Sequence, residues 1–188
     1  MPHVIERLLD LMASTTTQKC SNLRYIYLAQ FGADIIPFCA QRYSESSDAG
    51  FRGALMRFVI QYSRTDDRAV SLAISALSDR SQKVRHSACA VLAYSLKHAV
   101  IPPLEVLLTR PCSKTADDAR RAIDCIKSGN HNRFYPVHDS WVVMPDDPVQ
   151  PKRKSVDDYI VRLGPELIPQ LEKIYGNIYQ RWDETRKI

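Results

Sequence analysis

The stretch Ala76–Leu92, which reads ALSDRSQKVRHSACAVL, predicts a helical hairpin. Two apolar, helix-favouring parts flank a short polar part, and polar residues that bond to nearby backbone groups favour turns over helix. Ser81 has the side chain preferred just before a helix start. Ala88, Cys89 and Leu92 then follow at the spacing of one face of an α-helix. We therefore expect one helix to continue through Leu77 and a second to begin after Ser81.

This hairpin recurs along the chain at an interval of 34 residues. Apolar residues of the second helix keep this interval in three sets: Ala54, Ala88 and Ala122; Leu55, Cys89 and Ile123; Phe58, Leu92 and Ile126. Residues of the first helix do the same: Ile36, Val70 and Leu104; Cys39, Ala73 and Leu107; Ala40, Ile74 and Leu108. A fixed period of this length is typical of repeat architectures. We predict an all-α fold with antiparallel hairpins over 34–63, 66–97 and 100–129.

Turn and capping residues agree with this division. Asp66 and Asp67 precede one helix, and residues 44–48 form a polar turn within the first hairpin. Thr115 with Asp118 three residues later resembles a capping box and predicts the start of the last repeat helix. Gly129 is placed to end that helix, because glycine adopts the left-handed conformation of a helix C-cap.

The segments Ala76–Asp79, Val84-Arg85 and Val100–Leu108, together with Ala88 and Leu92, resemble the HEAT-repeat pattern. The resemblance implies a right-handed α-solenoid in which hairpins stack side by side. In that family an aspartate and an arginine pair within a repeat, which implies an ion pair between Asp79 and Arg85. It also implies that the second helices line the concave surface, the usual binding face of such arrays.

The ends of the chain fit as additions to the array within a single domain, 1–188. Residues 3–31 carry two apolar helical patterns and predict an N-terminal capping hairpin. Four prolines interrupt residues 133–155, so we expect an irregular excursion there, since proline breaks a continuous helix. Residues 156–188 predict C-terminal helices that close the array.

Composition excludes several function classes. The longest apolar run, Ala88–Tyr94, is far shorter than the roughly 20 residues of a membrane-spanning helix. The N-terminus lacks the pattern of a secretory leader, so we expect a cytoplasmic protein. The five cysteines and five histidines are scattered, which indicates neither a disulfide framework nor a metal site. We expect no cofactor.

Catalysis has little support in the sequence. His138, Asp139 and Ser140 are adjacent, but adjacency along the chain is not the geometry of a catalytic triad. Only six glycines are present, and none forms a phosphate-binding loop. We expect a protein that is not an enzyme.

The face opposite the apolar one on each second helix is the expected binding surface. The candidate partner-binding residues are Arg52, Met56, Ile60, His86, Tyr94, Lys97, Arg120, Asp124 and His131, with Trp141 from the excursion as an aromatic anchor. Apolar and aromatic groups beside cations resemble the cores of protein interfaces. The alternative is that Met56, Ile60 and Tyr94 pack on a neighbouring helix or on the excursion.

Binding to another protein is the leading functional hypothesis, and its specific form is a cytoplasmic inhibitor or immunity protein that binds a toxin. The alternative is nucleic-acid binding. Residues 48–100 carry a net charge of +4 and residues 101–135 carry +2, and the repeat pattern also resembles HEAT-like DNA glycosylases, which hold DNA in a basic concave surface. A third possibility is a scaffold subunit of a larger complex.

Overall fold

A computed structural model of the chain describes residues 2–14, 28–29, 31–109, 112–135 and Met144. Every regular element in these ranges is a helix, which confirms the predicted all-α class for the described residues. Four expected features lie wholly or mostly outside the described residues. They are most of the second half of the capping hairpin, most of the excursion, Trp141 within it, and the C-terminal helices expected at 156–188.

The first described part is α1, Pro2–Ser14. Its buried side chains are Ile5, Leu8, Leu9 and Met12, which recur at the three- and four-residue spacing of one helix face. The apolar stripe expected for the N-terminal segment is therefore a buried stripe in the structure.

The second described part spans Phe31 to Tyr135 and includes Met144. Its helices are α3 (Ile36–Glu45), α4 (Ala49–Val59), α5 (Asp67–Ala76), α6 (Gln82–Ser95), α7 (Ile101–Leu108) and α8 (Ser113–Ser128). Short 3-10 segments adjoin them at Gly32–Ile35, Ile60–Tyr62, His98–Val100 and His131–Arg133.

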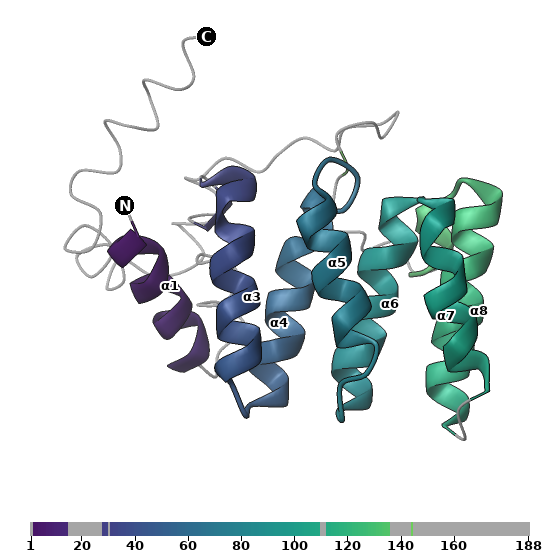
Figure 1. The fold of residues 1–188 in the computed structure, drawn as a ribbon, viewed down its shortest axis with the longest axis horizontal. Coiled ribbons are helices and arrows are strands. Elements are labelled where there is room, and N and C mark those ends of the chain that lie inside the picture. Colours follow the sequence, from purple (N-terminus) through teal and green to yellow (C-terminus); the bar gives the residue numbers. More distant parts are fainter. Residues whose placement is uncertain (1, 15–27, 30, 110–111, 136–143, 145–188) are drawn as a thin grey trace, which may run out of the picture. The chain divides into compact units, whose positions relative to one another are not determined.

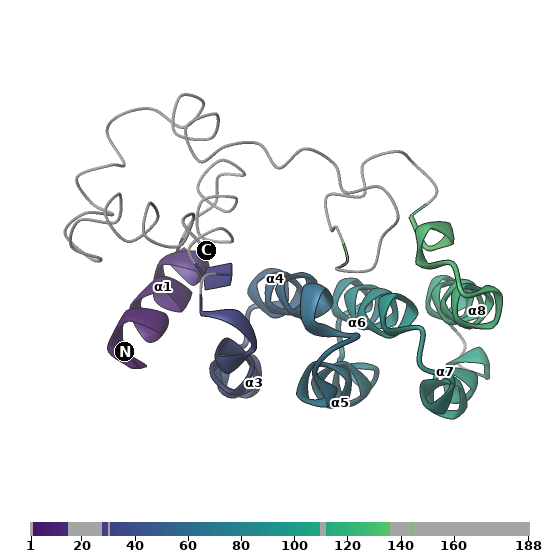
Figure 2. The ribbon, with the colours of Figure 1, turned by 90° about the horizontal axis from the view of Figure 1, so that it is seen from above.

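These six helices alternate between two layers (Figures 1 and 2). We call α3, α5 and α7 the outer layer, and α4, α6 and α8 the inner layer. Helix α6 lies between α4 and α8 and packs on both, and it also packs on α5. Each outer helix is joined by a short connection to the inner helix that comes next in the chain.

Polar side chains and glycine set several helix ends. The Asp48 carboxylate accepts hydrogen bonds from the backbone N–H groups of Gly50 and Phe51 and so caps α4. Asp66 caps α5 in the same way, as predicted, by accepting from the N–H of Arg68. Gly129 ends α8 with a left-handed φ of 63°, also as predicted.

The predicted start of the last inner helix is wrong. Helix α8 begins at Ser113, before the residues expected to cap it. Thr115 Oγ1 accepts hydrogen bonds from Arg85, and Asp118 Oδ1 lies 3.0 Å from His86 Nδ1, so both side chains contact α6 and not the end of their own helix. Contacts between helices have thus replaced the local capping that the spacing suggested.

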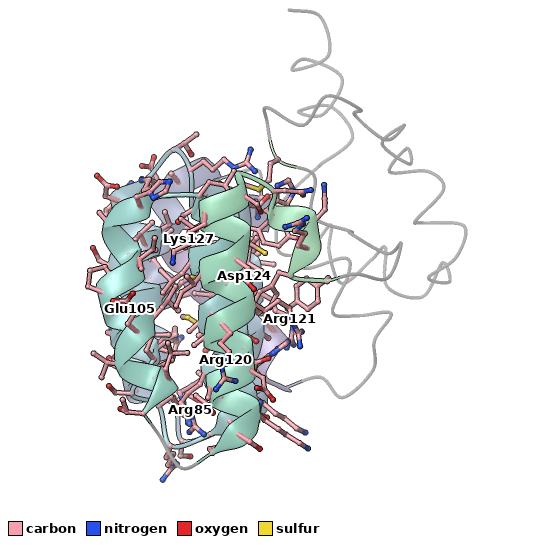
Figure 3. All side chains as sticks on the ribbon, turned by 90° about the vertical axis from the view of Figure 1, so that its right-hand side faces the viewer. Arg85, Glu105, Arg120, Arg121, Asp124 and Lys127 are labelled. Atoms are coloured by element: carbon pink, nitrogen blue, oxygen red, sulfur yellow. The ribbon has the colours of Figure 1, made fainter. Side chains whose placement is uncertain are left out.

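The core lies between the two layers and between neighbouring inner helices. Leu55, Cys89 and Ile126, each from one of the predicted apolar sets, are almost fully buried. Ala54 is the one member of the second-helix sets that is partly exposed. Helix α8, by contrast, has a polar outward face, where Arg120 and Asp124 are solvent-exposed (Figure 3).

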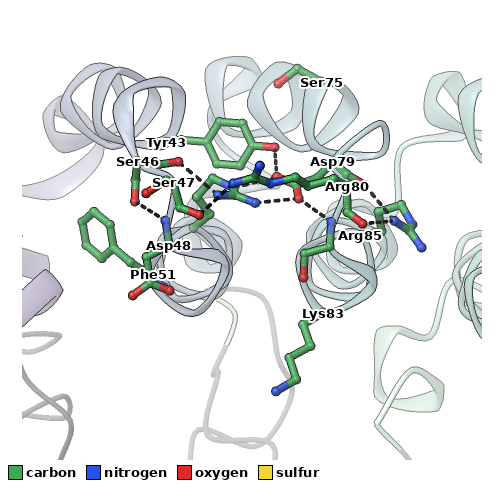
Figure 4. Close-up of polar contacts among 12 residues, drawn as sticks. Tyr43, Ser46, Ser47, Asp48, Phe51, Ser75, Asp79, Arg80, Lys83 and Arg85 are labelled. Carbon is green, nitrogen blue, oxygen red and sulfur yellow. Dashed lines mark hydrogen bonds and ion pairs between the residues drawn. The ribbon is translucent and has the colours of Figure 1, made fainter.

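A buried ion pair joins α4 to the turn between α5 and α6 (Figure 4). Arg52 donates from Nε and Nη2 to the two carboxylate oxygens of Asp79, at 2.8 and 2.9 Å. Both side chains are 5% exposed. Asp79 also accepts from the Tyr43 hydroxyl at 2.8 Å and from the Ser81 N–H at 2.7 Å, while Arg52 donates to the Ser46 carbonyl. Every charged atom of the pair therefore has a partner.

The ion pair expected between Asp79 and Arg85 is wrong, because Arg52 of the preceding hairpin occupies the Asp79 carboxylate. Arg85 donates instead to the backbone carbonyls of Asp79 and Arg80 and to the Thr115 hydroxyl. Thus Arg52 links α4 to the α5–α6 turn, and Arg85 links that turn to α8. Each arginine connects one hairpin to the next.

Replacing Asp79 tests this connection. Burial alone would raise the pKa of the Asp79 carboxyl, but hydrogen bonds from Arg52, the Ser81 N–H and Tyr43 outweigh burial and lower the pKa to about 2. Since this pKa is lower in the folded than in the unfolded chain, the stabilisation is present above about pH 4 and is lost as the pH falls toward about 2. Asp79→Asn should lower the free energy of unfolding at pH 7 by about 3 kcal/mol in urea titrations.

The matched control is Glu105→Gln on the exposed surface of α7, which should change stability by less than about 0.5 kcal/mol. Asp79→Asn should also flatten the acid-dependent loss of stability, because it removes the group that titrates. Equal stability of the two variants at pH 7 would contradict a structural role for the pair.

Candidate functional site

The chain returns over the inner layer after α8. The His131 ring lies 4.5 Å from the Tyr94 ring, centroid to centroid, and the Phe134 ring lies 5.4 Å from that of His86. His131 and Phe134 are both buried. The segment His131–Tyr135, which we call the return segment, therefore covers part of α6.

Arg64 forms hydrogen bonds with both the return segment and α6. Its Nε donates to the Tyr94 carbonyl at 2.9 Å, and its Nη2 lies 2.7 Å from His131 Nδ1. A guanidinium only donates hydrogen bonds, so His131 Nδ1 is the acceptor and the ring carries its proton on Nε2. The imidazole is therefore neutral in this arrangement.

Tyr135, at the end of the return segment, packs against the rings of Phe134 and of Tyr94 and His86 on α6. Its ring is 5.7 Å from the His86 ring of α6. Burial raises the pKa of Tyr135 to about 12, while the charges of Arg57 and Arg121 act in the opposite direction. We call Arg57, His86, Asp118, Arg121 and Tyr135 the Tyr135 cluster.

Small residues leave room for the Arg57 side chain on α4. A Cβ at Gly53 would lie 3.7 Å from Arg57 Nη1 and 3.9 Å from the Ser87 hydroxyl, so this guanidinium lies against the helix surface between α4 and α6. No other described residue forms a hydrogen bond or ion pair with Arg57. Within the described part of the chain, its donors are available to a ligand.

Arg121 enters the cluster from α8. Its guanidinium carbon lies 5.7 Å from the centroid of the Phe134 ring, a cation–π arrangement, and Nη1 donates a long hydrogen bond of 3.4 Å to the Phe134 carbonyl. Figure 3 shows the side chain directed from α8 toward the return segment. These contacts leave most of its five N–H donors uncommitted.

His86 and Asp118 complete the cluster. His86 Nδ1 lies 3.0 Å from Asp118 Oδ1, and Gln82 Nε2 donates to Asp118 Oδ2 at 3.2 Å. Asp118 is buried, whereas the His86 side chain is 31% exposed. The carboxylate is thus held by α6, and the imidazole is accessible beside the aromatic rings.

Most of the residues predicted to form the binding surface do not lie on it. Met56, Ile60 and Tyr94 are at most 1% exposed, and His131 is 4% exposed. The expectation that they present an open surface is wrong. Tyr94 packs against the rings of His131 and Tyr135, and Tyr135 belongs to the excursion on which the alternative expected Tyr94 to pack. Ile60 lies in a 3-10 turn that packs on α6.

The charged candidates are dispersed. Arg52 is buried in its pair with Asp79 and cannot meet a partner. Lys97 pairs with Asp67, while Arg120 and Asp124 lie on the outward face of α8. Of the predicted set, His86 alone is in the Tyr135 cluster, and Trp141 lies outside the described residues.

Sequence reasoning missed Arg57, Arg121 and Tyr135. The positions 34 residues from the two arginines hold Val91 and Ser87, so no repeated charge marked them. The sequence feature that could have indicated this site is the Phe134-Tyr135 pair, which comes shortly after the last repeat helix. Aromatic residues that come after an amphipathic array need a surface to pack on, and the nearest one is the inner layer.

The two layers differ in charge. By residue count, α4 carries +2, α6 carries +2 and α8 carries +1, whereas α3, α5 and α7 carry 0, 0 and −1. Arg52 and Arg85 of the inner layer are used in internal bonds, but Arg57 and Lys83 are not, and Lys83 extends away from the outer layer (Figure 4). The inner layer is therefore the more positively charged of the two layers.

Other site types find no structural counterpart among the described residues. Within these ranges, no group of three or more His, Cys, Asp or Glu is arranged to hold a metal ion. None of the described helices is long and apolar enough to cross a membrane. No model of a protein family matches the sequence, and no curated protein matches it.

Phe134 is the residue whose removal tests the packing of the return segment. Phe134→Ala deletes a fully buried ring and should weaken the attachment of the segment by about 3 kcal/mol. We expect faster hydrogen exchange at the backbone amides of 131–135, while exchange in α3 stays unchanged. Val106→Ala, at a side chain 63% exposed on α7, is the control and should leave both regions unchanged. Unaltered exchange at 131–135 in Phe134→Ala would show that the segment is not held by this contact.

Proposed function

We propose that this chain is a HEAT-like α-solenoid that works as a non-enzymatic protein-interaction module and binds an acidic protein through its inner layer. The specific role proposed is that of a cytoplasmic inhibitor or immunity protein acting on a toxin. The observation that carries the binding proposal is the more basic inner layer, where Arg57 forms no hydrogen bond or ion pair with another described residue and Arg121 lies over the Phe134 ring.

The arrangement of the helices supports the solenoid part of the proposal. Helices α3 to α8 alternate between two layers, and each inner helix lies beside the next (Figure 2). The residue sets that recur every 34 positions fall in corresponding helices, as with Leu55 in α4, Cys89 in α6 and Ile123 in α8. Hydrogen bonds from Arg52 and Arg85 each connect one hairpin to the hairpin that follows it in the chain.

Composition and exposure support protein as the partner class. Arginine and tyrosine are enriched among the residues that dominate protein interfaces, because each combines a large contact area with directed hydrogen bonds. The Tyr135 cluster contains both types. The Phe134 ring contacts both the Tyr135 ring and the Arg121 guanidinium.

Nucleic acid is the second candidate, favoured by the net positive charge of α4, α6 and α8. Non-specific binding to duplex DNA commonly uses about six to ten phosphate contacts along a track. On α8 the cations alternate with Asp117, Asp118 and Asp124, which would repel such a track. The charge pattern therefore suits a partner with discrete acidic side chains better than a continuous polyanion.

The test is affinity capture from the native cells with the tagged full chain after nuclease treatment. Arg57→Glu combined with Lys83→Glu reverses two inner-layer charges and should reduce recovery of a stoichiometric protein partner at least about tenfold. Arg42→Glu with Arg68→Glu makes the same change of charge on the outer layer and should leave recovery unchanged. Circular dichroism establishes that both variants fold.

Three outcomes would contradict the proposal. Equal recovery by the two double variants would mean that the inner layer is not the binding surface. Loss of all bound material after nuclease treatment would assign the surface to nucleic acid. Recovery of no stoichiometric protein by the unmodified chain would remove the interaction function itself.

A further inference from the structure

The return segment is attached through a hydrogen bond that only a neutral histidine can accept. We propose that protonation of His131 breaks this bond and weakens the attachment of the return segment to the inner layer in mildly acidic solution. This response is a property of the chain alone and does not depend on the proposed function. Its consequence for a partner rests on that function, because a segment that detaches carries Tyr135 away from the surface proposed to bind the partner.

The acceptor role of His131 is the first reason. Arg64 Nη2 lies 2.7 Å from His131 Nδ1, and Arg64 Nε donates to the Tyr94 carbonyl at 2.9 Å. A guanidinium only donates hydrogen bonds, and a protonated imidazole donates from both of its nitrogens. A proton on Nδ1 therefore leaves two N–H groups facing each other where one hydrogen bond had been.

The burial of the ring is the second reason. His131 is 4% exposed, and its ring lies 4.5 Å from that of Tyr94, which is 1% exposed. A charged imidazole loses most of its hydration in such a position, whereas in the detached segment it is solvated. The proton therefore binds more readily to the detached segment than to the attached one, and acid shifts the equilibrium toward detachment.

His131 is the group of its surroundings that changes charge near neutral pH. Within the described part of the chain, the titratable and charged groups facing it are Arg64 from the α4–α5 connection, Tyr94 on α6, Cys125 on α8 and Arg133 in its own segment. Burial raises the pKa of the Cys125 thiol to about 11. Tyrosine, buried cysteine and arginine keep one charge between pH 5 and 8, and histidine changes its charge there.

His86 also contacts the return segment and also titrates in this range. Its ring lies 5.4 Å from that of Phe134 and 5.7 Å from that of Tyr135. Its Nδ1, however, lies 3.0 Å from the Asp118 carboxylate, which is compatible with a positive charge on the ring. Protonation of His86 therefore does not oppose attachment of the segment, and the two histidines can be separated by substitution.

The experiment measures hydrogen exchange at the backbone amides of 131–135 in the full chain at pH 7.5 and at pH 5.5, with each rate corrected for intrinsic exchange. Three of these amides, those of Asn132, Arg133 and Phe134, donate hydrogen bonds in the attached segment. The corrected rates should rise at least about tenfold at pH 5.5, because a buried hydrogen bond is lost. Exchange in α3 should not change, since the Asp79 carboxyl, with a pKa of about 2, is charged at both pH values.

His131→Asn and His86→Asn are the matched variants. The asparagine oxygen at 131 replaces Nδ1 as an acceptor for Arg64 and does not titrate, so the corrected exchange at 131–135 should be equal at the two pH values within about twofold. His86→Asn keeps the bond between Arg64 and His131 and should retain the tenfold rise. Imidazole ¹⁵N resonances of the unmodified chain provide a test without substitution, because protonation of His131 and the rise in exchange should share one midpoint.

Four results would overturn the inference. They are equal corrected rates at both pH values in the unmodified chain, a rise that persists in His131→Asn, a rise that disappears in His86→Asn, and a protonated His131 in a segment that stays protected. None of these measurements involves a partner. If acid releases the segment while the chain captures no protein at pH 7, the response to pH stands and the proposed binding function falls.

Discussion

The buried pair between Arg52 and Asp79 is the interaction on which the arrangement of the hairpins depends. Removing two charges from water costs several kcal/mol per ion, and only complete hydrogen bonding offsets that cost. Here the guanidinium has the carboxylate and the Ser46 carbonyl as acceptors, and the carboxylate has the Tyr43 hydroxyl and the Ser81 N–H as further donors. These bonds form together only when the α5–α6 turn sits at one position against α3 and α4. The pair therefore contributes specificity of register as well as stability.

The position of that turn determines which side chains the inner layer presents. Helix α6 starts directly after Ser81, so the bonds to Asp79 orient its first residues, and Arg85 extends the same constraint to Thr115 on α8. His86 comes directly after Arg85 and meets Asp118. The Tyr135 cluster is assembled on this frame, because its side chains come from three helices that the two arginines hold in order.

The sequence predicted those features that are local or periodic. Helix identity follows from apolar spacing, and Asp66 and Gly129 end their helices through bonds and conformations that involve immediate neighbours. The partner of Asp79 could not be predicted in this way. Arg52 and Arg85 are both close to the α5–α6 turn in space, and only the packing of hairpins decides which one reaches the carboxylate.

The binding surface also depends on packing between distant parts of the chain, so local and periodic features did not predict it. Helical periodicity correctly placed His86 on an accessible face of α6, but it carried no information about the path of the chain after α8. The return segment covers Tyr94 and brings Tyr135 to the ring of His86, which lies 49 residues earlier in the chain. A contact of that sequence separation leaves no period in the sequence. Residues expected to be exposed were thus buried, and residues that no repeat marked became the candidate site.

We propose that the partner contacts the inner layer at Tyr135. Site-specific photocrosslinking in the native cells can detect this contact, with p-benzoylphenylalanine placed at Tyr135 and, separately, at the exposed Val106 of the outer layer. We expect a discrete protein adduct, resistant to nuclease, from position 135 and none from position 106. An adduct from position 106 alone, or from neither position, would contradict it.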